Sequence, residues 1–93
     1  MADTLFRLES TIQARRSADP DSSYVARLTA KGRGKIAQKV GEEGVELALA
    51  RMKDDSAEMA NEAADLLFHM MVLLEDAGLS LADAISVLQD RHK

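Results

Sequence analysis

The sequence contains no cysteine, no tryptophan, a single proline and only three aromatic residues among 93 positions. The absence of cysteine excludes disulfides, thiolate metal sites and cysteine nucleophiles. Because aromatic residues are so few and hydrophobic residues make up 46% of the chain, the core must be built from Leu, Val, Ile, Ala and Met. That composition is typical of packed helices, so we expect an all-α fold.

Long apolar runs and an excess of positive charge are missing as well. No stretch reaches the roughly 20 apolar residues that a membrane-spanning helix needs, and the first residues do not form an apolar leader. The formal net charge is −4, which argues against nucleic acid as a partner because phosphate backbones are bound through Lys and Arg. We expect a cytoplasmic protein that binds neither membranes nor nucleic acid.

Residues 1–93 contain no repeat, low-complexity tract or linker, which predicts a single domain. A chain of this length buries only a modest fraction of its surface, so a wide apolar surface must be covered by a partner. We therefore expect self-association.

Capping residues and apolar spacing predict five helices joined by short connections. The expected helices run from Asp3 or Thr4 to about Arg16, from Ser22 or Ser23 to Lys31, from Lys35 to about Lys53, from a cap at Ser56 to Gly78, and from a cap at Ser80 to the C-terminus. Short connections favour antiparallel neighbours. The third and fourth helices are expected to form a central antiparallel hairpin about Asp54.

The expected third helix carries acids beside an apolar stripe. At about 100° per residue, the stripe consists of Ile36, Val40, Leu47 and Ala50. Glu43 falls inside this stripe, whereas Glu42 and Glu46 lie to one side of it. A carboxylate at position 43 is therefore expected to be partly buried.

The expected fourth helix is apolar over most of its circumference, which predicts a nearly surrounded helix. One narrow polar stripe interrupts the apolar cover, and it consists of Glu62, Asp65 and His69. If the hairpin turns at Asp54, Glu43 lies opposite Asp65 and Glu46 lies opposite Glu62.

Four carboxylates at one level of a hairpin repel one another strongly unless protons or a hard cation neutralise them. Mg²⁺ suits oxygen ligands and keeps waters that a phosphate can replace, so we predict a Mg²⁺ site at Glu43, Glu46, Glu62 and Asp65. A single Glu-x-x-Glu pair is usually a solvated, salt-bridged surface. The paired, apolar-flanked arrangement favours the metal site.

The other polar residues near the acids could have either a structural or a functional role. His69 is expected to orient a carboxylate rather than to bind metal itself. Lys35 and Lys39 either pair with Glu42 or Glu43 along the helix or bind substrate phosphates. Lys31 and Arg33, on a glycine-flanked turn, are weaker phosphate-binding candidates.

The pattern Glu42-Glu43-x-x-Glu46 followed by Glu62-x-x-Asp65 resembles the all-α nucleotide pyrophosphohydrolase superfamily, which includes MazG and the dimeric dUTPases. A longer set of matches is similar to one branch, the phosphoribosyl-ATP pyrophosphatases, over essentially the whole chain. These matches are Ser23-Tyr24, Leu28-Thr29-Ala30-Lys31-Gly32, Lys35-Ile36-Ala37-Gln38-Lys39-Val40-Gly41-Glu42-Glu43 and Glu62-Ala63-Ala64-Asp65-Leu66-Leu67-Phe68-His69.

The resemblance implies Mg²⁺-dependent hydrolysis of phosphoribosyl-ATP to phosphoribosyl-AMP and pyrophosphate, the second step of histidine biosynthesis, by a homodimer that completes a helical bundle. We expect the metal-holding carboxylates to position the attacking water, and Glu42 either to assist that water or to support the metal ligands from behind. The family also includes fusions to a cyclohydrolase with Cys and His ligands, and the sequence is expected to be the stand-alone form.

Two other functions fit the same residues. An acidic quartet serves any polyphosphate, so a house-cleaning pyrophosphohydrolase acting on nucleoside triphosphates is the first alternative. The second is a non-enzymatic helical dimerisation module whose acids face water or form salt bridges between subunits.

Overall fold

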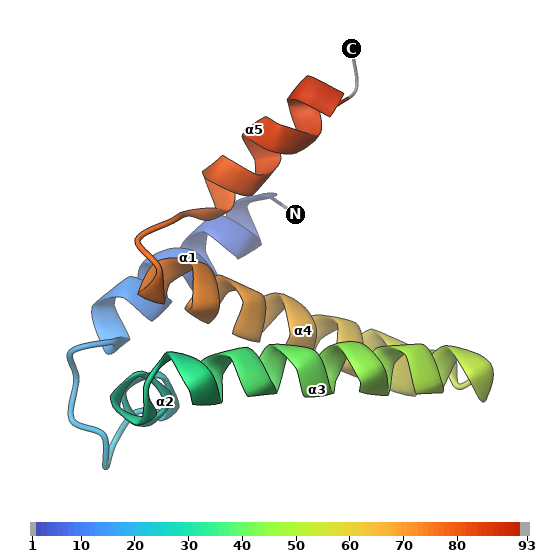
Figure 1. Cartoon of the computed structure of the whole chain (residues 1–93), viewed down its shortest axis with the longest axis horizontal. Helices are drawn as coiled ribbons and strands as arrows, with labels where there is room; N and C mark the ends of the chain where they lie inside the picture. The colour runs from blue at the N-terminus through green and yellow to red at the C-terminus, as the bar shows by residue number, and fades with distance from the viewer. Residues whose placement is uncertain (1, 92–93) are drawn as a thin grey trace.

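The structure is a computed structural model that describes residues 2–91. The described residues form five α-helices and no strand, which confirms the all-α prediction (Figure 1). The helices are α1 (Ala2–Arg15), α2 (Tyr24–Lys31), α3 (Arg33–Met52), α4 (Ser56–Asp76) and α5 (Leu81–Arg91). The expected continuation of the last helix to the C-terminus lies outside the described residues. No described helix is both long enough and apolar enough to cross a membrane.

Helices α3 and α4 form the predicted antiparallel hairpin and make the most extensive contact between any two of the described helices (Figure 1). The turn between them places Asp54 at φ 56°, a left-handed conformation that Asp tolerates better than most residues. Asp55 follows, and its side chain accepts a hydrogen bond from the backbone N–H of Glu58. The prediction that Ser56 caps this helix was therefore wrong by one residue, because Asp55 is the residue with the extended backbone before the helix and Ser56 is already its first helical residue.

The expectation that all neighbouring helices are antiparallel was also wrong. In Figure 1, α2 is seen end-on while α3 lies in the plane of the picture, and α5 projects away from the hairpin. Two left-handed glycines make these changes of direction possible, since Gly32 ends α2 at φ 93° and Gly78 follows α4 at φ 78°. Glycine adopts positive φ without a steric penalty, so the chain can bend sharply at both points.

The core lies where α1 and α2 pack on the α3–α4 hairpin. Its buried members are Ile12, Val25, Leu28, Ile36, Met71, Val72 and Leu81. Burial of such aliphatic side chains removes apolar surface from water, at about 1.5–3 kcal/mol for each large residue. The core therefore fixes α2 and the first half of α3 against the second half of α4.

Arg16 joins the end of α1 to the end of α4. Its guanidinium donates to the Glu75 carbonyl and to an Asp76 carboxylate oxygen, each at 3.2 Å. The Glu75 carbonyl is one of those that a helix leaves without an intrahelical partner at its C-terminus, and it also accepts a hydrogen bond from the Gly78 backbone N–H.

The prediction that α4 is nearly surrounded does not hold within the single chain. Leu67 is 40% exposed, and Ala60 and Ala64 are exposed as well. The neighbouring helix α3 leaves a wider apolar surface open, with Val45, Leu49 and Met52 at 60%, 53% and 83% exposure. The outer faces of the hairpin are thus apolar and uncovered.

Candidate metal-binding active site

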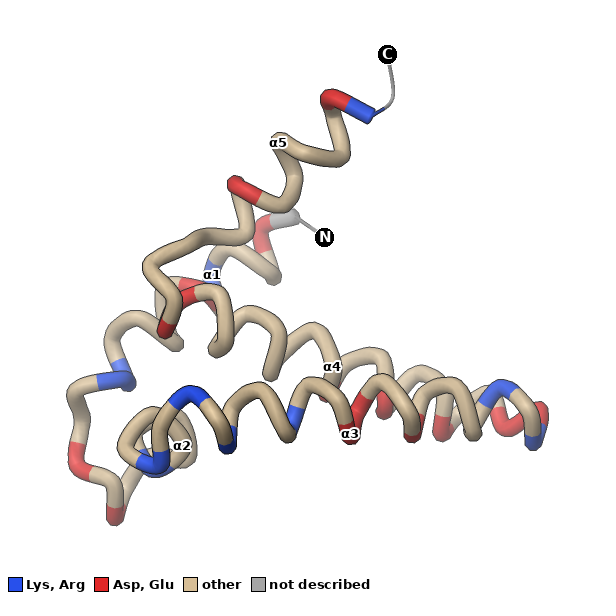
Figure 2. The backbone as a smooth tube through the Cα atoms, viewed as in Figure 1, with Lys and Arg blue, Asp and Glu red and all other residues tan. Residues whose placement is uncertain are grey.

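Acidic and basic side chains are separated along the hairpin. Figure 2 shows basic residues over the first part of α3, acidic residues at its middle near further acids on α4, and basic residues again close to the turn. Because a cationic and an anionic stretch lie on one helix, a ligand with both phosphates and a bound cation would find partners for each.

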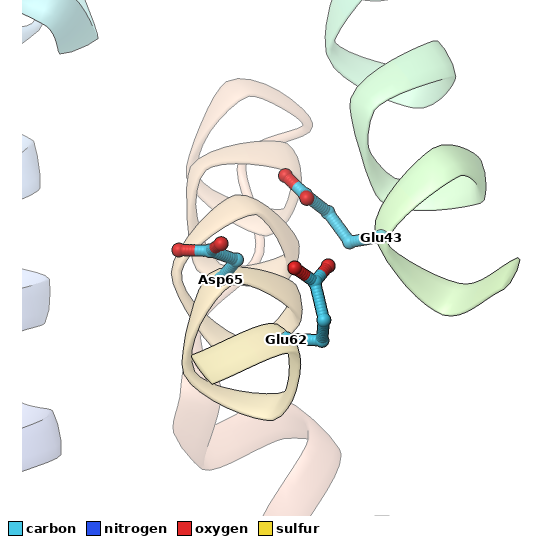
Figure 3. A group of neighbouring side chains, drawn as sticks. All are labelled: Glu43, Glu62 and Asp65. Atoms are coloured by element: carbon cyan, nitrogen blue, oxygen red, sulfur yellow. The ribbon is translucent and has the colours of Figure 1, made fainter. Parts of the chain in front are cut away.

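Three carboxylates from facing helices converge at the middle of the hairpin. Each of Glu43, Glu62 and Asp65 offers an oxygen within 4.8 Å of the other two (Figure 3). Glu43 extends from α3, whereas Glu62 and Asp65 lie one turn apart on α4. The predicted register about Asp54 explains this convergence, because it places positions 43 and 65 at the same height.

These carboxylates differ in their exposure to water. Glu43 is 5% exposed, Glu62 is half-buried and Asp65 is exposed. The Oε2 atom of Glu62 is buried and has no hydrogen-bond partner among the described residues. A buried carboxylate oxygen without a donor is costly, which makes this atom a natural ligand for a cation.

Glu46 lies beside Glu62 and changes its ionisation. A side-chain hydrogen bond with Glu46 is the largest cause that raises the pKa of Glu62 from 4.5 to about 7. Burial of the group acts in the same direction, as do the negative charges of Glu46, Asp65 and Glu43. The four predicted acids therefore form one electrostatic cluster, with three converging oxygens and Glu46 at its edge.

The geometry and the donor set fit a hard divalent cation. All the offered atoms are carboxylate oxygens, which Mg²⁺ prefers, and a positive charge would remove the repulsion that raises the pKa of Glu62. The partnerless oxygen of Glu62 provides an independent structural reason for such an ion.

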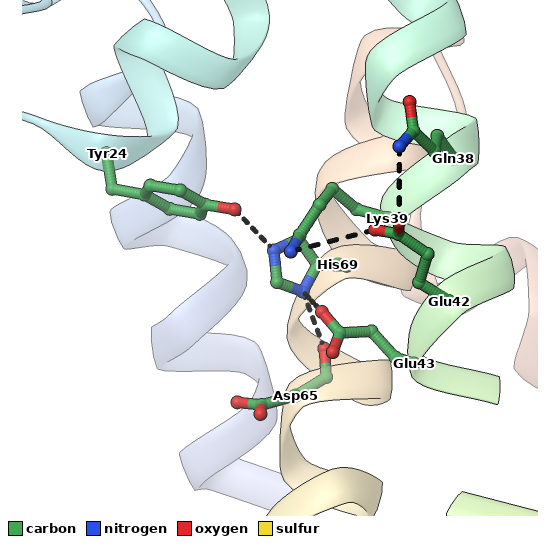
Figure 4. A network of polar contacts seen from close by, with 7 residues as sticks. All are labelled: Tyr24, Gln38, Lys39, Glu42, Glu43, Asp65 and His69. Atoms are coloured by element: carbon green, nitrogen blue, oxygen red, sulfur yellow. Dashed lines mark hydrogen bonds and ion pairs between the residues drawn. The ribbon is translucent and has the colours of Figure 1, made fainter. Parts of the chain in front are cut away.

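His69 lies behind Glu43 rather than beside the open side of the cluster. Its Nδ1 is 2.7 Å from the Oε1 atom of Glu43 and 2.9 Å from the backbone carbonyl of Asp65 (Figure 4). His69 is only 6% exposed. These contacts agree with the orienting role that the sequence suggested.

Glu42 points away from the three converging carboxylates. It accepts a hydrogen bond from the Gln38 amide at 3.2 Å and lies 4.0 Å from the Lys39 ammonium (Figure 4). Lys39 is thus placed near the acids, on the turn of α3 that precedes them. Lys39 therefore pairs with Glu42 along the helix, which is one of the two roles that the sequence predicted for this lysine.

The other predicted phosphate ligands lie farther toward the start of α3. Lys35 is half-buried, and Lys31 is exposed at the end of α2. Arg33 lines a groove of about 630 Å³ between the start of α3 and the end of α4. The remaining lining residues are Gly34, Ile36, Ala37, Leu73, Asp76 and Ala77. None of the predicted acids lines this groove.

Sequence reasoning missed one member of the polar network. The hydroxyl of Tyr24 lies 2.7 Å from Nε2 of His69, and the two residues are 45 positions apart. The only sequence signal was the Ser23-Tyr24 pair at the start of a short helix, which a capping role for the serine explained equally well.

The fold and the site define an all-helical protein whose central hairpin carries a cluster of carboxylates suited to a divalent cation. The model of the phosphoribosyl-ATP pyrophosphohydrolase family matches residues 5–92. The chain belongs to this family, which confirms the resemblance identified from the sequence.

Individual relatives agree with this membership. The chain is 58% identical over 92 residues to a phosphoribosyl-ATP pyrophosphatase of Rhizorhabdus wittichii, covering 99% of this chain and 87% of that protein. It is 57% identical to a histidine biosynthesis bifunctional protein HisIE of Vibrio vulnificus, and 53% identical to that of Escherichia coli. Each of these two matches covers 96% of this chain, but only 42% and 44% of the relative. The chain thus spans less than half the length of these bifunctional relatives.

Proposed function

We propose that the protein hydrolyses phosphoribosyl-ATP to phosphoribosyl-AMP and pyrophosphate, the second step of histidine biosynthesis, with the help of Mg²⁺. The observation that carries this proposal is the convergence of Glu43, Glu62 and Asp65 in a chain that the family model matches over residues 5–92. The family supports the substrate, and the three oxygens support a metal-assisted reaction of a polyphosphate.

The carboxylates are the proposed metal ligands. Glu43, Glu62 and Asp65 would hold Mg²⁺, with Glu46 at the edge of the site. When bound, the metal would supply positive charge that offsets the charge developing on the phosphoryl oxygens. Because Glu43 and His69 are both buried, one wall of the site is fixed and closed to water.

The basic residues of α3 are proposed to hold the substrate. Lys39 and Lys35 would bind phosphate oxygens, and Lys31 and Arg33 would add positive charge at the start of the helix. A phosphate that binds Lys39 would compete with Glu42 for the ammonium, since the two groups lie 4.0 Å apart.

The chemical step needs a water molecule and a proton acceptor. The water oxygen forms a bond to phosphorus, the anhydride P–O bond breaks, and pyrophosphate leaves with the bonding electrons. Glu42 is our candidate for the group that takes the proton of the water or orients it. Release of Glu42 from Lys39 by the incoming phosphate would free an oxygen for this purpose.

A homodimer is the second part of the proposal. The uncovered apolar side chains Val45, Leu49 and Met52 on α3 and Leu67 on α4 support it, since a chain of 93 residues exposes them at a cost in solubility. A groove of about 530 Å³ on the same helix is lined by Gln38, Gly41, Glu42, Val45 and Glu46. A second copy packed here would complete a helical bundle next to the acidic cluster.

The chemistry of the reaction and the charge of the chain support a cytoplasmic enzyme that binds no nucleic acid.

The decisive experiment measures pyrophosphate release from phosphoribosyl-ATP, ATP and dUTP, with and without Mg²⁺. Mg²⁺-dependent release from phosphoribosyl-ATP alone is expected. Release from ATP or dUTP only would favour the house-cleaning alternative, while absence of release from all three would favour a non-enzymatic dimerisation module. The variant Glu62→Gln tests whether this activity depends on the acidic cluster. It removes one proposed metal ligand with little change in shape, and it should abolish turnover.

A further inference from the structure

Tyr24 is the one residue of α2 whose side chain reaches into the polar network behind the acidic cluster. Its neighbours fix it there: Ser23 accepts a hydrogen bond from the Ala26 backbone N–H and is 4% exposed, and Val25 and Leu28 belong to the core. The backbone of Tyr24 is therefore anchored on both sides. Tyr24 is 41% exposed, and its hydroxyl is directed toward His69 by the 2.7 Å contact with Nε2 and by the contact between the two rings.

The contacts of His69 determine which ring nitrogen carries hydrogen. Nδ1 faces the Asp65 carbonyl at 2.9 Å and a Glu43 carboxylate oxygen at 2.7 Å, and a carbonyl oxygen can only accept. Nδ1 is therefore protonated and donates. In the neutral imidazole Nε2 then carries a lone pair, and the Tyr24 hydroxyl at 2.7 Å is placed to donate to it.

Two aromatic rings hold the plane of the imidazole. The Tyr24 ring meets the His69 ring edge to face, with centroids 5.7 Å apart and planes at 89°. Phe68 contacts the same ring at 5.1 Å and 86°, and packs against the core. An imidazole held in this way can direct its N–H at one oxygen of Glu43 and leave the other carboxylate oxygen for a ligand.

We infer that Tyr24 is a positioning residue for the proposed reaction, acting through His69 on the Glu43 carboxylate. The Tyr24 hydroxyl holds the His69 ring in place through Nε2, and the hydrogen on Nδ1 orients Glu43 toward the cation. Removal of a group that hydrogen-bonds directly to a metal ligand, as His69 does to Glu43, commonly changes metal affinity by about 10- to 100-fold. Tyr24 acts one contact further out, so a smaller change is expected for it. The inference rests on the proposed metal site, but the state of His69 can be measured without metal.

The test compares the wild type with Tyr24→Phe, which keeps the ring and removes only the hydroxyl. In the metal-free protein, ¹⁵N NMR of the His69 ring is expected to show hydrogen on Nδ1, and Tyr24→Phe should shift the Nε2 resonance while the hydrogen stays on Nδ1. Calorimetric titration with Mg²⁺ alone should show a reduced affinity, by up to about 10-fold. Turnover of Tyr24→Phe should fall at limiting Mg²⁺ and recover at saturating Mg²⁺.

Thr29→Val is the matched control, since it also removes one hydroxyl from α2. The Thr29 hydroxyl is buried and has no partner among the described residues, so its loss should leave the His69 spectrum and the Mg²⁺ affinity unchanged. An unchanged His69 spectrum in Tyr24→Phe would overturn the inference, and so would a changed spectrum with wild-type Mg²⁺ affinity. If the wild type itself bound no Mg²⁺, the proposed metal site would fail, and the metal-free spectra would still decide whether the Tyr24 hydroxyl holds the His69 ring through Nε2.

Discussion

The imidazole of His69 on α4 and the carboxylate of Glu43 on α3 form a buried pair with 2.7 Å between Nδ1 and Oε1. Their side chains are only 8% and 7% exposed. A buried carboxylate is costly unless a donor holds it, and His69 provides that donor. The pair therefore allows an acid inside the apolar stripe of α3, where it can face Glu62 and Asp65.

Addition of Mg²⁺ should stabilise the folded protein. A ligand that binds only the folded state raises the free energy of unfolding by about 2.7 kcal/mol when its concentration is 100 times Kd. Asp65→Asn should abolish most of the rise in Tm, because it removes one of the three converging carboxylates. Differential scanning calorimetry with Mg²⁺ measures this effect. Asp21→Asn, at an exposed loop position, is the control and should keep the full rise; equal stabilisation of both variants would contradict a metal site in the hairpin.

The metal-free protein should lose stability as the pH rises from about 4.5 to about 7. Over this range the folded protein holds a proton on Glu62 that the unfolded chain has already released, because the pKa of Glu62 is raised from 4.5 to about 7. The state that binds more protons is favoured at low pH, so the free energy of unfolding falls as the pH increases. Urea unfolding at several pH values measures the slope.

Glu62→Gln is the control for this pH dependence. Glutamine cannot ionise, so the part of the slope that comes from position 62 should disappear in the variant. The same fall in both proteins would show that another group is responsible. Saturating Mg²⁺ should also flatten the slope of the wild type, because the cation favours the ionised carboxylate.

Lys39→Gln should weaken substrate binding more than it slows the chemical step. A charge-assisted hydrogen bond contributes about 1.5–3 kcal/mol, which corresponds to a rise in KM of at least roughly 10-fold. Steady-state kinetics with phosphoribosyl-ATP at saturating Mg²⁺ separates KM from kcat. Lys53→Gln is the control at the far end of α3, where Lys53 lies 3.7 Å from Glu58. A loss of activity that fell entirely on kcat would argue against phosphate binding by Lys39.

Leu49→Asp should prevent formation of the proposed dimer. Leu49 is 53% exposed on the uncovered face of α3, and an aspartate there would bury an unpaired charge in the proposed interface. Sedimentation velocity should show the wild type at the dimer mass and the variant at the monomer mass. Ala14→Asp introduces the same charge at an exposed position of α1 and should remain dimeric. A monomeric wild type would contradict the proposed dimer.

Most of the fold follows from local sequence signals. Helix α2 begins after Ser23, as the capping pattern predicts, and ends where Gly32 adopts positive φ. The hairpin turn at Asp54 also lies where the pattern predicts it. Directions between helices were not predictable in this way, because the crossing of α2 with α3 depends on how the core side chains pack.

The sequence by itself predicted that four acids meet on the hairpin, and the structure brings the oxygens of three of them within 4.8 Å of one another, with Glu46 outside this group. Helical periodicity and one turn position fix the heights of Glu43, Glu62 and Asp65, and these are local quantities. Only the tertiary structure decided how the acids differ from one another. It buries one oxygen of Glu62 without a partner, gives Glu43 a donor in His69, and brings Tyr24 from α2 to that imidazole. Burial and hydrogen bonding between distant segments depend on the packing of the whole chain, which no local pattern encodes.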